Sequence, residues 1–96
     1  MVMKLEFDFT PRFKRAYVKL PEKTRTLFGD KMHQFLDDWR HPSLRVKKIQ
    51  GTETVWEASL NMSIRFTFEF SKDPEGTVVC ILLNIGDHEH VLRPPY

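Results

Sequence analysis

A strict alternation of apolar and polar residues in the second half of the chain is the feature that most constrains its fold. Residues 64–70 read Ile-Arg-Phe-Thr-Phe-Glu-Phe, and a period of two is typical of a β-strand with one buried face. A nearly continuous apolar run follows at residues 78–83, as expected for a central strand that is covered on both faces. The chain is therefore expected to fold around a β-sheet.

The N-terminal part of the chain predicts a strand followed by a short helix. Residues 2–9 alternate between apolar and polar side chains, which indicates a first strand. Thr10 is a typical N-cap, and Pro11 suits the first helical position because its missing N–H costs nothing there. Apolar residues at helical spacing then predict a helix over residues 11–20, which Pro21 ends.

A second helix and four further strands complete the predicted order. An apolar stripe predicts a helix over residues 22–39, and Pro42 prevents its continuation. The segments expected to form strands after it are residues 44–49, 56–60, 64–70 and 77–85. This order predicts an α+β, two-layer domain over residues 1–96: an N-terminal strand, an αα-hairpin and then a mostly antiparallel four-stranded sheet.

Charge is concentrated in one part of the sequence. The formal net charge is only +2, but Arg40, Arg45, Lys47 and Lys48 fall within nine residues, and no acidic residue occurs between positions 40 and 52. Such a stripe suits contact with phosphates even when the net charge is small. The alternative is an ordinary solvated face of a strand.

Cysteine usage and hydropathy indicate the compartment. Cys80 is the one cysteine and lies inside the apolar run, which excludes an internal disulfide and a cysteine-ligated zinc site. The longest apolar run is six residues, whereas a membrane span needs about 20. Residues 1–9 also lack the apolar region of a signal peptide. We therefore expect a cytoplasmic protein with no membrane partner.

Strand parity selects the side chains on the sheet face that the helices leave uncovered. If the apolar residues of the last strands pack against the helices, Glu57, Ser59, Arg65, Thr67 and Glu69 point the other way. The hairpin then brings Ser59 close to Arg65. The alternative for this group is a simple surface ion pair between Glu57 and Arg65.

The sequence His-Glu-His at residues 88–90 directly follows the last predicted strand. A histidine at a strand end beside a basic cleft suits a general acid, because its pKa lies near neutrality. The alternative is a solvated loop histidine. Two histidines alone are a weak basis for a metal site, so we predict neither a metal nor another cofactor. The sequence contains no glycine-rich phosphate loop and no legible Ser-His-Asp or Cys-His arrangement.

Five short segments together carry a family resemblance. They are residues 5–21, 41–48, 55–59, 63–68 (Ser-Ile-Arg-Phe-Thr-Phe) and 83–92 (Leu-Asn-Ile-Gly-Asp-His-Glu-His-Val-Leu). In this order and spacing they resemble the RelE/ParE superfamily of toxins from type II toxin–antitoxin modules. The resemblance covers nearly the whole chain and implies a single RelE-like toxin domain.

The RelE branch of this superfamily implies an activity and a set of site residues. It implies a metal-independent endoribonuclease that cuts mRNA on the translating ribosome and is held in check by a cognate antitoxin. Arg65 matches the arginine that stabilises charge on the phosphate, and His88 matches a catalytic position, where we assign the general acid. Glu57 is assigned as the general base. The residues expected to contact RNA are Arg45, Lys47, Lys48, His90 and Tyr96.

Two positions depart from the family pattern. Ser59 stands where many relatives carry a basic residue, and Tyr96 is the only aromatic residue after His88. These departures leave two alternatives open. One is a ParE-like toxin that binds DNA gyrase, and the other is a catalytically silent family member that only binds an antitoxin. The sequence favours no particular oligomeric state.

Overall fold

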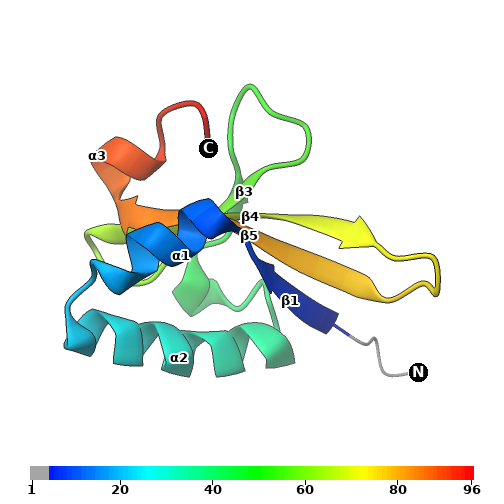
Figure 1. Ribbon diagram of the computed structural model, residues 1–96, viewed down its shortest axis with the longest axis horizontal. Coiled ribbons are helices and arrows are strands. Elements are labelled where there is room, and N and C mark those ends of the chain that lie inside the picture. Colours follow the sequence, from blue (N-terminus) through cyan, green and yellow to red (C-terminus); the bar gives the residue numbers. More distant parts are fainter. Residues whose placement is uncertain (1–4) are drawn as a thin grey trace.

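The computed structural model describes residues 5–96 and shows a sheet with helices on both of its sides (Figure 1). The part of the predicted first strand at residues 2–4 lies outside the described residues. The elements, in chain order, are β1 (Leu5–Phe9), α1 (Pro11–Val18), α2 (Glu22–Asp37), the 3-10 turn η1 (Pro42–Leu44), β2 (Lys47–Lys48), β3 (Trp56–Ser59), β4 (Ile64–Lys72), β5 (Val78–Asp87) and α3 (His88–Val91).

The five strands form one sheet in the order β1-β5-β4-β3-β2. β1 pairs with β5 in parallel, whereas the other neighbouring strands are antiparallel. The apolar run at residues 78–83 lies in β5, which has a strand on each side, as its composition predicts. The predicted fold class, an α+β domain with an N-terminal strand, two helices and a mostly antiparallel sheet, is therefore confirmed.

Thr10 joins the first strand to the first helix. Its side-chain oxygen accepts a hydrogen bond from the backbone N–H of Phe13 at 3.1 Å, which caps α1 as predicted. Its hydroxyl also donates to the carbonyl oxygen of Leu82 in β5 at 2.9 Å. One side chain therefore fixes both the start of α1 and its position beside β5.

Aromatic side chains fill the space between the helices and the sheet. Phe28 and Phe35 of α2 contact Phe66 and Phe68 of β4 edge to face, with ring centroids 5.5 and 5.2 Å apart. Phe35, Phe66 and Phe68 are fully buried. The apolar faces that these periods of two and 3.6 residues predicted for the strand and the helix therefore pack together in one core. Within residues 5–96, no helix has the length and apolar character needed to cross a bilayer.

The structure corrects the predicted boundaries around residue 42. The second helix ends at Asp37 rather than Trp39, whose ring instead packs against Trp56 at 5.3 Å. The predicted strand over residues 44–49 is reduced to Lys47–Lys48. Its first residue, Leu44, instead ends η1, and Arg45 adopts a left-handed conformation with φ of 47°, which interrupts extended pairing.

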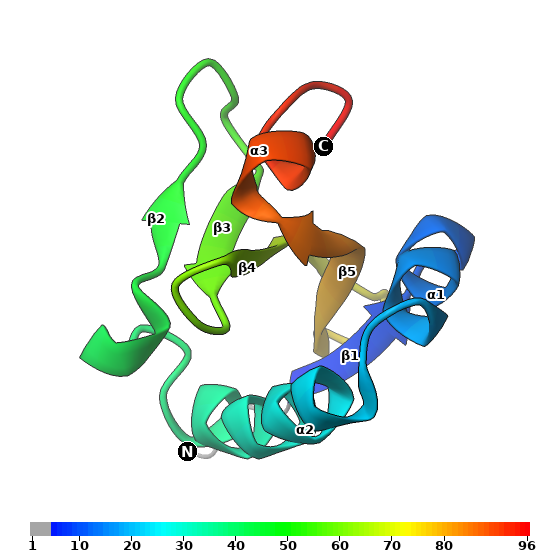
Figure 2. The same cartoon turned by 90° about the vertical axis from the view of Figure 1, so that its left-hand side faces the viewer.

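The C-terminal segment contains a short helix, His88–Val91, that the sequence patterns above did not predict. Asp87 caps this helix, α3, by accepting hydrogen bonds from the N–H groups of Glu89 and His90. Figures 1 and 2 show α3 and α2 on opposite sides of the sheet. Val91 is buried against the sheet at Gly86, where an added Cβ would lie 3.0 Å from its Cγ2 atom. α3 therefore covers part of the sheet face that points away from α1 and α2, which the strand pattern predicted to be uncovered.

Candidate functional site

A polar hollow of about 210 Å³ lies where α3 meets the outer face of the sheet. Its walls come from the segment before β2, from β2, β3 and β4, and from α3 with the residue that follows it. The lining residues are Arg45, Lys47, Glu57, Ser59, Arg65, His88 and Leu92. Residues that are more than 40 positions apart in the chain thus share one small surface.

Strand register explains why the β3 and β4 residues meet. Ser59 is directly opposite Arg65, as predicted, and Glu57 is opposite Thr67. Cross-strand partners in an antiparallel pair point to the same face of the sheet. On the other side of β3, Lys47 is opposite Glu57, which adds a cation from β2 to the same face.

Glu57 is the buried acid of the hollow. Its side chain is 9% exposed, and its Oε1 atom lies 3.9 Å from Nζ of Lys47, which is 73% exposed. The register places Thr67 rather than Arg65 opposite Glu57, so the ion pair that forms here is Glu57–Lys47 and not Glu57–Arg65. A buried carboxylate that lines the hollow thus has a largely exposed cation as its partner.

Arg65 is held by the backbone of the turn that joins β3 to β4. Its Nη1 atom donates to the carbonyl oxygen of Asn61 at 2.7 Å and lies 3.3 Å from that of Ile64. A guanidinium has five N–H donors, so this anchoring leaves others available to an anion in the hollow. Backbone carbonyls orient the group without neutralising its charge.

His88 is fixed by the same turn. Its backbone N–H donates to the carbonyl oxygen of Ser63 at 2.9 Å, and its Nδ1 atom lies 3.4 Å from that oxygen. A proton on Nδ1 is favoured by this carbonyl, which leaves Nε2 as the nitrogen that can exchange a proton with a ligand. The position of α3 thus decides where the imidazole lies.

His90 has a different environment from His88. Its Nδ1 atom lies 2.7 Å from Oδ2 of Asp87, the N-cap residue of α3. This hydrogen bond lowers the pKa of the Asp87 carboxyl, with further lowering by the capped N–H groups. His90 therefore supports the cap of α3 and is not among the residues that line the hollow.

The structure separates the predicted RNA contacts into two groups. Arg45 and Lys47 line the hollow, whereas Lys48, His90 and Tyr96 do not. Successive strand residues point to opposite faces, and Nζ of Lys48 lies 5.0 Å from the centroid of the Trp56 ring. The basic stripe is thus divided between the two faces of the sheet.

Sequence reasoning missed two residues that support the site. Asn61 accepts hydrogen bonds from the N–H groups of Ser63 and Ile64 at 2.9 and 2.8 Å, which shapes the turn that holds Arg65 and His88. Asp87 caps α3. A signal for Asp87 was present, since Asp is a typical N-cap and Glu89 places an acidic residue in the first turn. Among residues 5–96, no three His, Cys, Asp or Glu side chains are grouped as metal ligands.

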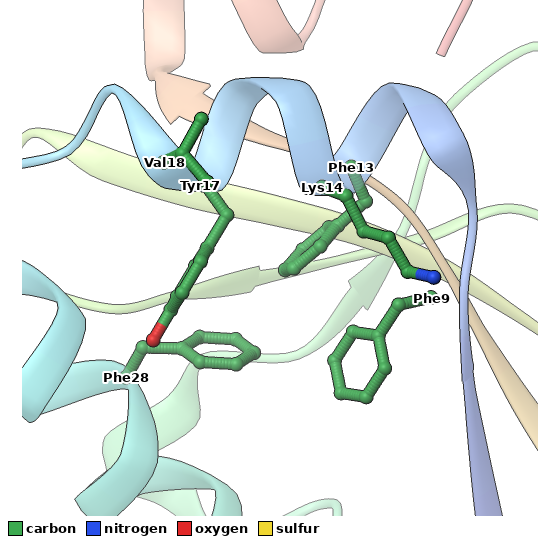
Figure 3. Close-up of a pocket in the computed structure, with 6 residues that line it drawn as sticks. All are labelled: Phe9, Phe13, Lys14, Tyr17, Val18 and Phe28. Carbon is green, nitrogen blue, oxygen red and sulfur yellow. The ribbon is translucent and has the colours of Figure 1, made fainter.

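A second, apolar hollow lies between α1 and Phe28 of α2 (Figure 3). It has a volume of about 420 Å³ and is lined by Phe9, Phe13, Lys14, Tyr17, Val18 and Phe28. Figure 3 shows aromatic rings around it and Lys14 at its rim. Such a surface suits contact with another protein, because it offers apolar area but few groups for acid–base chemistry.

The polar hollow has the chemistry needed to transfer protons around a phosphate. It combines a buried carboxylate, an anchored guanidinium and an imidazole with a free nitrogen (Glu57, Arg65 and His88), and Arg45 and Lys47 add positive charge at its wall. A carboxylate can accept a proton, a protonated imidazole can donate one, and a guanidinium stabilises negative charge between them.

Comparison with known proteins identifies the fold. Neither a protein-family model nor a curated protein sequence matches the chain. Among solved structures, a YoeB/ParE toxin from Agrobacterium tumefaciens superposes with a TM-score of 0.69 at 13% identity, covering 90% of this chain and 99% of its own. A chain of the archaeal RelE–RelB complex from Pyrococcus horikoshii superposes with a TM-score of 0.63 at 16% identity, and the match covers 94% of this chain and 99% of that chain. A mutant of the E. coli toxin RelE in the free state superposes with a TM-score of 0.62 at 20% identity, and the match covers 96% of this chain and 90% of that chain.

These similarities extend over 90–96% of the chain rather than one motif. The chain therefore has the fold of the RelE/ParE toxins, and the resemblance that its sequence motifs indicated is confirmed at the level of the fold.

Proposed function

We propose that this chain, which has the RelE/ParE toxin fold, is the toxin of a type II toxin–antitoxin module and acts in the cytoplasm as a ribosome-dependent mRNA endoribonuclease. The observation that carries this proposal is the meeting of Glu57, Arg65 and His88 in one polar hollow with Arg45 and Lys47 on its wall. The whole chain, residues 1–96, serves as one toxin domain in this proposal.

The proposed reaction uses the 2′-hydroxyl of the RNA as the nucleophile. Glu57 accepts the proton of this hydroxyl while its oxygen forms a bond to the adjacent phosphorus. The bond from phosphorus to the 5′-oxygen of the next nucleotide breaks, and the protonated imidazole of His88 donates its Nε2 proton to that oxygen. Arg65 stabilises the negative charge that builds up on the phosphate oxygens. The products are a 2′,3′-cyclic phosphate and a free 5′-hydroxyl, and no metal takes part.

Substrate binding is assigned to the cations at the wall of the hollow. Arg45 and Lys47 lie beside the reacting groups and are placed to contact the phosphates that flank the cleaved bond. An incoming phosphate also competes for Lys47, whose pairing with Glu57 is long at 3.9 Å. Release of Lys47 would leave the Glu57 carboxylate available as a base.

Cleavage of mRNA during cell-free translation, mapped by primer extension, tests the proposal. Arg65→Ala and His88→Ala are each expected to lower the cleavage rate by about 100-fold or more, while circular dichroism shows an unchanged fold. Lys72→Ala, at the far end of β4, is the matched control and should cut like the unmodified protein. Cleavage at the unmodified rate by both site variants would overturn the assignment.

A cognate antitoxin is the proposed protein partner. Four of the structural neighbours come from toxin–antitoxin complexes, and the apolar hollow beside α1 offers a surface that a partner would cover. Val18 at its rim is 65% exposed, and Leu36 on α2 is 50% exposed outside the hollow. Co-expression with the product of the adjacent reading frame should yield a stable complex that Val18→Asp weakens and Leu36→Asp does not. Equal weakening by both would argue against this docking surface.

The second candidate function is toxicity or antitoxin binding without RNA cleavage. Ser59 favours it, because a hydroxyl takes the place opposite Arg65 where relatives commonly carry a cation. A ParE-like toxin would damage DNA in growing cells, whereas a nuclease would stop translation first. Pulse labelling with radioactive methionine and a DNA-damage reporter, measured after induction, separates these outcomes.

A further inference from the structure

Helix α1 carries an excess of positive charge that the polar hollow does not use. Residues 10–21 contain four cations and no acid. Three of them, Arg12, Arg15 and Lys19, occur at spacings of three and four residues, which places them on one face of the helix. At 1.5 Å per residue these three positions span about 10 Å along the helix axis. The fourth, Lys14, lies at the rim of the apolar hollow (Figure 3).

The three cations line one side of an open hollow of about 480 Å³ between α1 and the end of β5. The opposite wall is formed by the last part of β5, residues 84–87, and by Ile64 at the start of β4. β1 pairs with β5 only as far as Leu82, so α1 takes the place of a neighbouring strand beyond that point. The hollow is therefore a channel bounded by a cationic helix and a strand edge.

Within the described part of the chain, these three charges have no acidic partner. Among residues 5–96, no ion pair involves Arg12, Arg15 or Lys19. The acid in this hollow is Asp87, and its carboxylate already accepts hydrogen bonds from the N–H groups of α3 and from His90. Three unpaired cations on one face repel each other, and an anionic ligand would remove that repulsion.

The channel meets the candidate site at the ends of two strands. Ile64 and Asp87 line the channel, and the residues that follow them, Arg65 and His88, line the polar hollow. A polyanion that occupies the polar hollow can thus continue past the start of α3 and along α1. Asn84 adds a neutral donor, because its Oδ1 atom accepts from the N–H of Ile85 and its amide nitrogen faces no partner among the described residues.

We propose that Arg12, Arg15 and Lys19, the α1 strip, form a second phosphate-binding surface, which holds the RNA backbone next to the stretch that enters the polar hollow. The identity of the ligand as RNA rests on the proposed function. The surface fits a polynucleotide better than a protein segment, because its charges follow a line and the apolar hollow lies on the other side of α1. The contacts are to phosphates, so the α1 strip adds affinity and not base specificity.

Binding of a fluorescein-labelled 15-nucleotide oligo(U), measured by anisotropy, tests the α1 strip. The assay uses the His88→Ala background, so that cleavage cannot consume the probe. The triple variant Arg12→Gln, Arg15→Gln, Lys19→Gln is expected to bind at least about 10-fold more weakly at low salt. Its slope of log affinity against log salt should be smaller by about 2, since each lost contact to a single strand contributes about 0.7.

The matched control removes the same charge elsewhere. Lys23→Gln, Arg25→Gln, Lys72→Gln changes three cations outside the hollows described here and should leave the salt slope unchanged. Equal loss of affinity in both triple variants would show a net-charge effect and overturn the proposal. Competition by poly-L-glutamate as strong as that by unlabelled oligo(U) would also overturn it, in favour of an acidic protein ligand. If the unmodified chain binds oligo(U) through the α1 strip but cuts no mRNA, the proposed function fails and the phosphate surface remains.

Discussion

Arg65 and His88 are both anchored to one turn, residues 61–63, by backbone carbonyl oxygens. Nη1 of Arg65 donates to the Asn61 oxygen at 2.7 Å, and the backbone N–H of His88 donates to the Ser63 oxygen at 2.9 Å. The two groups come from different elements, β4 and α3, so the turn sets their relative position. The geometry of the candidate site therefore depends on a segment that contributes no side chain to the proposed chemistry.

Asn61 is expected to control this geometry. Asn61→Ala removes the acceptor for two N–H groups of the turn, so we expect a loss of about 1–2 kcal/mol in the free energy of unfolding and a lower cleavage rate. Asn61→Asp keeps an acceptor oxygen and should preserve most of the stability and most of the cleavage rate. Urea unfolding and the translation-coupled cleavage assay measure the two quantities. A cleavage rate unchanged in Asn61→Ala would mean that the turn does not position the site.

The planar guanidinium of Arg65 is expected to matter beyond its charge. Arg65→Lys keeps one positive charge but loses the fork that contacts a backbone carbonyl and a phosphate together. We expect the cleavage rate to fall by about 100-fold, with little change in substrate affinity. Single-turnover cleavage at saturating ribosome–mRNA complex isolates the chemical step, and a lysine variant as fast as the unmodified protein would contradict the role assigned to Arg65.

Substitution of two glycines by alanine should change the stability of the fold in opposite directions. At Gly86 a new Cβ lies 3.0 Å from Cγ2 of Val91, so this buried side chain of α3 must give way. Gly86→Ala is expected to destabilise the fold by about 1–3 kcal/mol and to displace His88. At Gly29, within α2, nothing lies within 4 Å of an added Cβ, and Gly29→Ala should stabilise by about 1 kcal/mol. Thermal unfolding compares the pair, and a harmless Gly86→Ala would show that α3 is loosely seated.

The cap of α3 should make stability depend on pH in the acidic range. The hydrogen bond from His90 lowers the pKa of Asp87 from its ordinary value of 3.8. A carboxyl with a lowered folded-state pKa stabilises the fold above its unfolded-state pKa, and this contribution is lost as the pH falls through the folded-state value. Asp87→Asn keeps a capping oxygen but cannot titrate. The stability difference between the two proteins should therefore shrink as the pH falls from about 6 to 3, whereas a constant difference would contradict this origin.

Cys80 should be inert in the folded protein. It is fully buried in β5, and burial raises the pKa of its thiol to about 12. Because the thiolate is the reactive form, Ellman's reagent at pH 8 should label Cys80 only in urea. Rapid labelling of the native protein, at a rate well above that of global unfolding, would show that the sheet opens locally around β5.

Some of the candidate site could be predicted from local patterns because strand geometry is regular. The alternation over residues 64–70 placed Arg65 on the face away from the helices, and the short turn at 61–63 placed it opposite Ser59, as the register confirms. The same rule, applied to a strand over 44–49, failed because Arg45 adopts a left-handed conformation that ends the alternation. A single backbone angle of this kind leaves no trace in hydropathy.

The sequence by itself determined the class of fold, the order of its elements and the face of the sheet on which Arg65 lies, because these follow from side-chain periodicity within a few residues. Only the tertiary structure decided that Glu57 pairs with Lys47, that α3 covers part of the outer face, and that His88 meets Arg65 at the turn. These features depend on strand register and on contacts between segments far apart in the chain. Local propensity carries no information about which distant partners a side chain will find.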